Sequence, residues 1–247
     1  MSLNLLNKHL HCPQLWLANL EGSSDSLNSD FLDESSTQRY HRLSSPKKRQ
    51  QFLLSRWLIK YAVNHLFGIH FEDVVIDDNT DTCPKLPQLT SPFFCSLSHS
   101  HDWVAIVFAD LPCGVDIEIK KPRNNMIGMA KSFMSEREYE LYSSNTSQDY
   151  FYQCWCIKEA FYKSLPRSTQ FKTPFHTIDT GRLSQSPNCT LSSFTSEQYQ
   201  LAVFISSTIE IMDAYLVTPP SNATQPFTST SPMIVNWEQL PIRSLYK

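Results

Sequence analysis

Two acidic residues in the second half of the sequence have the spacing of a metal or phosphate site. Asp116 and Glu118 flank Ile117 in a stretch that alternates like a strand, so their carboxylates lie on one face, a few ångströms apart. Like charges this close cost free energy unless a cation joins them, and Mg²⁺ takes one or two carboxylates together with substrate phosphates. The alternative is a half-buried strand with a hydrated face, which an isolated Asp-x-Glu favours.

A second group of candidate residues lies on an expected helix. Trp155, Glu159 and Lys163 are spaced i, i+4 and i+8, which places them on one helical face. Glu159 has the chemistry to bind a metal or to accept a proton, and Lys163, one turn further on, to meet a phosphate. The alternative is an intrahelical Glu-to-Lys salt bridge worth a few tenths of a kcal/mol, and position alone does not decide between them.

A basic stretch without any acidic residue covers 35–71. On the helix expected there, Arg49, Arg56 and Lys60 are spaced i, i+7 and i+11 and so lie within about 40° of one another. A charged stripe is more often a solvated helix face. The lack of acidic residues shifts the interpretation toward an anion site, most simply a site for a phosphate.

A histidine with two neighbouring hydroxyls forms the fourth candidate, in the segment Ser98-His99-Ser100. This segment lies between two expected strands, and a histidine with hydroxyls at a strand end suits contact with a phosphate. A single loop histidine is more often structural.

The elements that must position these residues follow from local patterns. Ser45-Pro46 predicts the start of a helix and Gly68 its end, and Ser135 with Glu138 forms a capping box. The mixture predicts an α+β or α/β chain in two similar-sized halves, 1–111 and 112–247, divided at the turn 110–114. A loop is expected over 21–38, which is rich in Ser, Asp and Asn. Strands are expected at 94–98, 103–109, 115–119, 175–179, 200–205, 209–217 and 233–237, and further helices near 125 and over about 149–164.

The composition excludes several classes of protein. The 247 residues carry a net charge of −3, so no global positive field draws the chain to nucleic acid or an anionic membrane. The longest apolar run, 103–109, is far shorter than the roughly 20 residues that cross a bilayer, and polar residues interrupt the N-terminal leucines, unlike in a signal peptide. Seven cysteines at scattered spacings are typical of reduced thiols, so we expect a cytoplasmic protein. None of the five glycines falls in a Rossmann or P-loop pattern.

Taken in order, these segments resemble the Sfp-type 4'-phosphopantetheinyl transferases. Asp116 and Trp155 are 39 residues apart, which matches the family's G-[IV]-D followed by W-x-x-K-E-[AS]-x-x-K. Two positions depart from the family: the segment 83–87 only loosely resembles its Gly-Lys-Pro-like element, and His101 stands where a glycine is common. The resemblance covers roughly residues 40–165 and rests on 94–100, 114–118, 133–139 and 155–163.

The resemblance implies two similar α+β subdomains related by pseudo-twofold symmetry, each a small sheet packed on helices, with the active site in the cleft between them. The N-terminal half, 1–111, would supply the coenzyme A phosphate-binding helix and the Ser-His loop. The C-terminal half, 112–247, would supply the Mg²⁺-binding strand and the catalytic helix. Mg²⁺ would be held by Asp116, Glu118 and Glu159, and the residues implied to bind coenzyme A are Arg49, Arg56, Lys60, Ser98, His99 and Lys163.

The implied reaction moves phosphopantetheine from coenzyme A to a serine of an apo carrier protein and releases 3',5'-ADP. The carrier would be an acyl, peptidyl or polyketide carrier of fatty acid, polyketide or nonribosomal peptide biosynthesis. Asp116, Glu159 and Lys163 would be catalytic, with Glu159 the base, directly or through a metal-bound water, and Lys163 at the leaving phosphate. Glu138 also matches a family acidic position, although its place in the capping box suggests a structural role.

Expected partners are coenzyme A and the carrier, without nucleic acid or membrane, and we expect a monomer. The alternative is a related module that binds coenzyme A or a carrier without catalysis.

Overall fold

The computed structural model describes residues 10–20, 27–78, 83–89, 93–219 and 233–234. These divide into two units. The first contains the described residues up to Asp110 together with 212–219 and 233–234, and the second contains residues 111–211. Each unit packs helices against a small sheet, so the predicted α+β class is confirmed.

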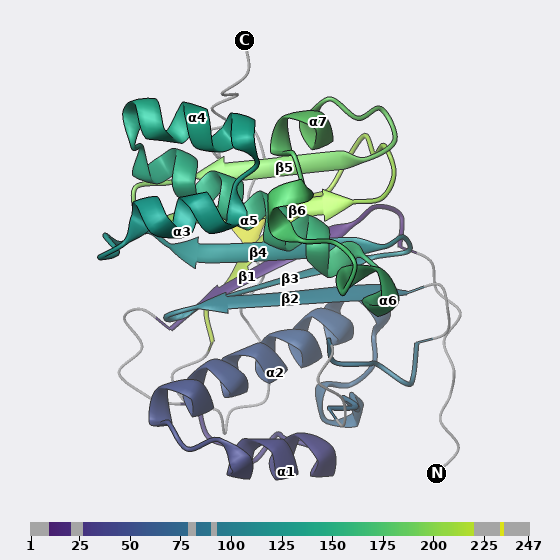
Figure 1. The fold of residues 1–247 in the computed structure, drawn as a ribbon. Helices are drawn as coiled ribbons and strands as arrows, with labels where there is room; N and C mark the ends of the chain where they lie inside the picture. The colour runs from purple at the N-terminus through teal and green to yellow at the C-terminus, as the bar shows by residue number, and fades with distance from the viewer. Residues whose placement is uncertain (1–9, 21–26, 79–82, 90–92, 220–232, 235–247) are drawn as a thin grey trace. The chain divides into compact units, whose positions relative to one another are not determined.

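The first unit is built on a five-stranded sheet of order β2-β3-β1-β7-β8, with helix α2 lying along it (Figure 1). Strand β1 pairs antiparallel with β3 and parallel with β7, which places a strand from late in the chain beside the first one. Helix α1 packs on α2. The elements are β1 (Gln14–Asn19), α1 (Glu34–Arg42), α2 (Pro46–Phe67), η1 (Phe71–Asp73), β2 (Phe94–Ser100), β3 (Trp103–Ala109), β7 (Asp213–Val217) and β8 (Met233–Ile234).

Helix α2 begins and ends where its sequence predicts. Pro46 occupies the first turn, and Gly68 closes the helix at φ 69°, a left-handed conformation that glycine adopts without a Cβ clash. Every residue from Phe52 to Val63 is buried, including two that carry positive charge, Arg56 and Lys60. The middle of the helix therefore lies inside its unit, whereas its first turn is exposed.

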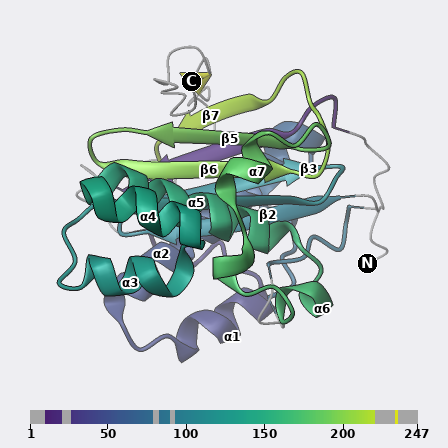
Figure 2. The ribbon, with the colours of Figure 1, turned by 45° about the horizontal axis from the view of Figure 1, so that its top comes forward.

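The second unit is a three-stranded antiparallel sheet of order β4-β6-β5, covered by helix α5, which packs on β4 and β6 (Figure 2). The helices expected near 125, after Ser135 and over 149–164 are all present. The elements are β4 (Cys113–Ile119), α3 (Met126–Phe133), α4 (Glu136–Asn145), α5 (Gln148–Ser164), α6 (Arg167–Gln170), η2 (Phe175–Thr177), α7 (Thr180–Ser184), β5 (Thr190–Thr195) and β6 (Tyr199–Ile205).

Three sequence-based expectations need correction. The strand expected at 175–179 is a 3-10 turn leading into α7. The predicted C-terminal half ran to residue 247, but β7 and β8 belong to the sheet of the first unit. The pairing of β7 with β1 joins residues about 200 positions apart in the sequence, so no local sequence pattern predicts it. The third is the segment 21–38, read as a loop, whose last residues begin helix α1.

Two strands, β1 and β5, were not anticipated. The expected strand at 233–237 is present at 233–234, and the rest of it lies outside the described residues. Among the described helices, none is both long and apolar enough to span a bilayer.

Candidate active site

Gly114 determines how closely helix α5 approaches strand β4. A Cβ on Gly114 would lie 1.8 Å from the carbonyl oxygen of Ala160 and 3.1 Å from the amide nitrogen of Ser164, both in the helix backbone. Because side chains alternate along a strand, Asp116 and Glu118 share the face on which Gly114 meets the helix. The glycine of the Gly-Val-Asp segment therefore lets the two carboxylates of β4 face α5 at short range.

The shortest link across this strand–helix contact joins Asp116 to Lys163. Lys163 Nζ donates to Asp116 Oδ1 at 2.7 Å and to the carbonyl of Val115 at 3.3 Å. The Asp116 side chain is 5% exposed, whereas that of Lys163 is 29% exposed. Burial lowers the pKa of Lys163, but the charge and hydrogen bond of Asp116 outweigh burial and raise that pKa above its usual value. The ammonium thus stays charged at the end of a side chain that is partly exposed.

Glu159 lies one turn before Lys163 on the same helix and is half-buried. Burial is the main cause that raises its pKa; Lys163 opposes the rise, and the charges of Asp116 and Glu118 add to it. The three carboxylates therefore act on one another electrostatically. The structure brings together the four residues of this unit that the sequence singled out.

Arg123 is a further charged residue at this site, and sequence reasoning missed it. The charged cluster thus consists of Asp116, Glu118, Arg123, Glu159 and Lys163. Its Nη2 lies 3.7 Å from Glu118 Oε2, and its Nε donates to the hydroxyl of Tyr152 at 3.1 Å. That hydroxyl donates in turn to the carbonyl of Lys121 at 2.8 Å. The available signal was the basic run 120–123 directly after the acidic strand.

The chemistry of the donor set fits Mg²⁺. Carboxylate oxygens are the ligands Mg²⁺ prefers, and a cation would relieve the repulsion that raises the pKa of Glu159. In the part of the chain that the structure describes, no three His, Cys, Asp or Glu side chains are gathered closely enough to hold a metal. Asp116 is instead neutralised by Lys163.

Another lysine of α5, Lys158, has a different environment. It is fully buried, and its Nζ donates to the carbonyls of Phe133 (3.1 Å), Phe175 (3.0 Å) and Ile178 (2.5 Å). It also pairs with Glu138 Oε2 at 2.6 Å. The first lysine of the W-x-x-K-E segment therefore ties α5 to the ends of three other elements.

Glu138 has the structural role that its position predicted. It forms the capping box of α4 with Ser135, and its Oε1 accepts from the amide (2.8 Å) and hydroxyl (2.7 Å) of Thr180. Burial raises the pKa of Glu138, but the hydrogen bonds and charge of Lys158 and the backbone amides outweigh it, so the pKa is lowered. Glu138 is 3% exposed and forms a buried ion pair with Lys158, which we call the structural pair.

In the first unit, the basic helix does not present the expected cationic stripe. Arg56 donates from Nε and Nη2 to Asp78 at 2.7 and 2.6 Å and is 3% exposed. Lys60 donates to the carbonyl of Val74 at 2.7 Å, and burial lowers its pKa. The helical phase predicted from the sequence is correct. However, the face of α2 that carries Arg56 and Lys60 is buried against hydrogen-bond acceptors from the segment that follows the helix. The assignment of Arg56 and Lys60 to a phosphate contact, and the alternative of a solvated face, therefore both need correction.

The other phosphate-binding candidates of this unit are Arg49, Ser98 and His99. Arg49 is half-buried, and its Nε donates to the carbonyl of Leu43 at 2.8 Å. Ser98 is buried and His99 exposed, because alternate residues of β2 face opposite sides. His101, where the family commonly has glycine, has φ 54° in the turn to β3, a conformation that glycine adopts more readily.

Carboxylates and a lysine held across a strand–helix contact have the chemistry to bind and activate a phosphate ester. In a comparison with known proteins, residues 112–218 match the model of the 4'-phosphopantetheinyl transferase superfamily. The matched region contains the whole charged cluster. We therefore assign residues 112–218 to that superfamily, as the sequence motifs predicted.

Individual relatives agree with this assignment. The chain is 31% identical over 142 residues to 4'-phosphopantetheinyl transferase psf-1 of Bacillus pumilus, covering 56% of this chain and 58% of that protein. It is 29% identical to Sfp of Bacillus subtilis, over 53% and 64% of the two chains. It is 27% identical to HetI of Nostoc, over 66% and 71%. The chain thus matches less than two thirds of the length of the two Bacillus proteins.

Proposed function

We propose that this protein transfers 4'-phosphopantetheine from coenzyme A to a serine hydroxyl of an apo carrier protein and releases 3',5'-ADP. The observation that carries this proposal is the Lys163–Asp116 contact beside Glu159, formed by two motif segments within the matched region. The names of the similar proteins support the same activity.

The residues of the cluster divide the work as follows. A serine hydroxyl is a weak nucleophile, so it needs a base that takes its proton as it attacks phosphorus. Glu159 is the candidate base because it is half-buried and lies one turn from Lys163. Lys163 is the candidate donor to the phosphate that leaves with 3',5'-ADP, because its side chain is partly exposed and its ammonium has two acceptors among the described residues for three N–H donors.

We further propose that the reaction requires Mg²⁺, held by Asp116, Glu118 and Glu159. When bound, the ion would neutralise charge on the phosphates of coenzyme A. The donor chemistry of three carboxylates and their mutual repulsion support this assignment.

In the first unit, Arg49 and His99 remain the candidates for contact with coenzyme A phosphates, since both reach the surface at least in part. Ser98 is buried, so we keep it only as the neighbour of His99 and not as a direct phosphate contact.

We propose that the protein works in the cytoplasm as a monomer. The seven cysteines, all free thiols, support a reducing compartment.

The test is incubation of the protein with coenzyme A, Mg²⁺ and a panel of apo acyl, peptidyl and polyketide carriers. Mass spectrometry should show the gain of one phosphopantetheine on at least one carrier, together with 3',5'-ADP. Omission of Mg²⁺, with chelation by EDTA, should stop the gain. Tight binding of coenzyme A or a carrier without any mass gain would instead identify a non-catalytic binding module.

A further inference from the structure

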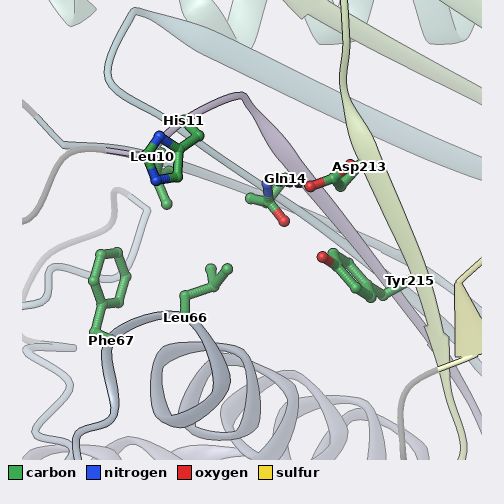
Figure 3. Close-up of a pocket in the computed structure, with 7 residues that line it drawn as sticks. All are labelled: Leu10, His11, Gln14, Leu66, Phe67, Asp213 and Tyr215. Atoms are coloured by element: carbon green, nitrogen blue, oxygen red, sulfur yellow. Dashed lines mark hydrogen bonds between the residues drawn. The ribbon is translucent and has the colours of Figure 1, made fainter.

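A pocket in the first unit is lined by residues other than those assigned to transfer. Its volume is about 460 Å³, within the range of small-molecule sites, and it opens where β1 and β7 meet the end of α2 (Figure 3). None of its residues belongs to the motif segments. It is lined by Leu10, His11, Gln14, Leu66, Phe67, Asp213 and Tyr215.

Gln14 presents a buried hydrogen-bond acceptor to this pocket. The residue is 5% exposed, and its Nε2 donates to Asp213 Oδ2 at 2.9 Å and to the carbonyl of Cys12 at 3.2 Å. These bonds fix the orientation of the amide and leave Oε1 on the other side. Within the described residues, Oε1 has no hydrogen-bond partner. In Figure 3 it points toward the space between Leu66 and Tyr215, so a ligand with a donor would satisfy it.

Asp213 makes the same end of the pocket negative. Its Oδ2 accepts from Gln14 and from the thiol of Cys12, at 3.3 Å from the sulfur, and both donors are uncharged. None of the ion pairs between described residues includes Asp213. Burial is the main cause that raises the pKa of Tyr215, and the charge of Asp213 raises it further. This field disfavours an anionic ligand.

The opposite side of the pocket is apolar. Leu66 and Phe67 lie at the end of α2, and Leu10 lies across from them. The ring of Tyr215 is stacked on Trp16 with 4.2 Å between ring centroids, which fixes its position. A ligand therefore meets hydrogen-bond acceptors at one end and hydrocarbon at the other.

We propose that this pocket binds a small organic cation, with an ammonium group between Gln14 Oε1 and Asp213 and an apolar body against Leu66 and Phe67. An ammonium has three N–H donors, so one group can serve both acceptors.

The first test is isothermal titration of the full chain with 2-phenylethylammonium. We expect saturable one-to-one binding, with 2-phenylethanol about tenfold weaker or more, because it lacks the charge. The anion 3-phenylpropionate should not bind. No binding of the ammonium at millimolar concentration, or equal binding of the anion, would overturn the proposal.

Two variants tie the binding to this pocket. Asp213→Asn keeps the shape and an acceptor for Gln14, and should weaken ammonium binding about tenfold. Leu66→Trp should fill the pocket and abolish binding, whereas Leu141→Trp, at an exposed position of α4, should leave it unchanged. Melting curves check that each variant is folded. If Asp213→Asn binds the ammonium as tightly as the wild type, the cation does not lie where we propose.

Discussion

Helix α5 carries two lysines, five residues apart, whose ammonium groups have different numbers of acceptors. Lys158 is fully buried and has three backbone carbonyls and the Glu138 carboxylate around it. Lys163 is partly exposed and has one carboxylate and one carbonyl among the described residues. An ammonium has three donors, so Lys158 is saturated whereas Lys163 retains a donor for a substrate oxygen.

The difference indicates that one motif serves two purposes. The W-x-x-K-E-A-x-x-K segment supplies a buried cation with four acceptors, Lys158, on one side of α5. On another side it supplies Glu159 and Lys163, which we propose to be the reactive residues. In the first unit, Arg56 belongs with Lys158, since it is buried and bound to Asp78 in two places. If the proposed roles are correct, a charged motif residue is reactive only where the acceptors around it are too few to satisfy it.

The largest effect is expected from removing the acidic partner of the reactive lysine. Asp116→Ala should abolish phosphopantetheine transfer, because it removes a proposed Mg²⁺ ligand and the anchor of Lys163. The measurement is carrier mass gain over time. Asp149→Ala, which removes the ion pair between the exposed Asp149 and Lys120 near the start of α5, is the matched control and should retain full activity. Appreciable turnover by a folded Asp116→Ala protein would contradict the assignment of the reactive face.

Glu159→Gln tests whether this face includes a base. The change keeps the shape but removes the basicity, so kcat should fall by about 10²–10⁴-fold while coenzyme A still binds. Steady-state kinetics and a separate coenzyme A binding titration, both at several Mg²⁺ concentrations, distinguish a role of Glu159 as the base from a role as a Mg²⁺ ligand only. Recovery of the rate at high Mg²⁺ would refute the base role and leave Glu159 as a metal ligand only.

Lys158→Met tests the structural side of the helix. Removing one partner of a buried ion pair leaves the other charge uncompensated, so we expect a loss of about 3–5 kcal/mol in the free energy of unfolding. Urea denaturation measures it, with Lys131→Met at an exposed position of α3 as the control. A stable Lys158→Met protein with impaired transfer would show that Lys158 is catalytic, and the contrast with Lys163 would fail.

The smallest expected effect is a pH dependence of the same structural pair. The pKa of Glu138 is lowered from its ordinary 4.5, so its contribution to stability is present above that value and is lost as pH falls through the folded-state pKa. Wild type should therefore be more stable than Glu138→Gln near neutral pH. The two denaturation curves should converge in acid. A difference that grows as the pH falls would have the wrong sign for this pair.

The sequence by itself determined the local parts of this protein. The proline and glycine that bound α2, the capping box of α4 and the alternation of β4 depend on neighbouring residues, so their patterns predicted the elements correctly. The alternation placed Asp116 and Glu118 on one face. The family resemblance indicated that this face would meet α5, which Gly114 makes possible.

Tertiary structure decided which charges are satisfied. Helical phase placed Arg49, Arg56 and Lys60 on one side of α2, but it does not report that Asp78 and the carbonyl of Val74 fold back onto that side. Likewise, the sequence did not separate Lys158 from Lys163, because the carbonyls around Lys158 come from segments up to 25 residues away. Burial and hydrogen bonding are properties of non-local contacts, so they separate structural from reactive charges only after the chain has folded.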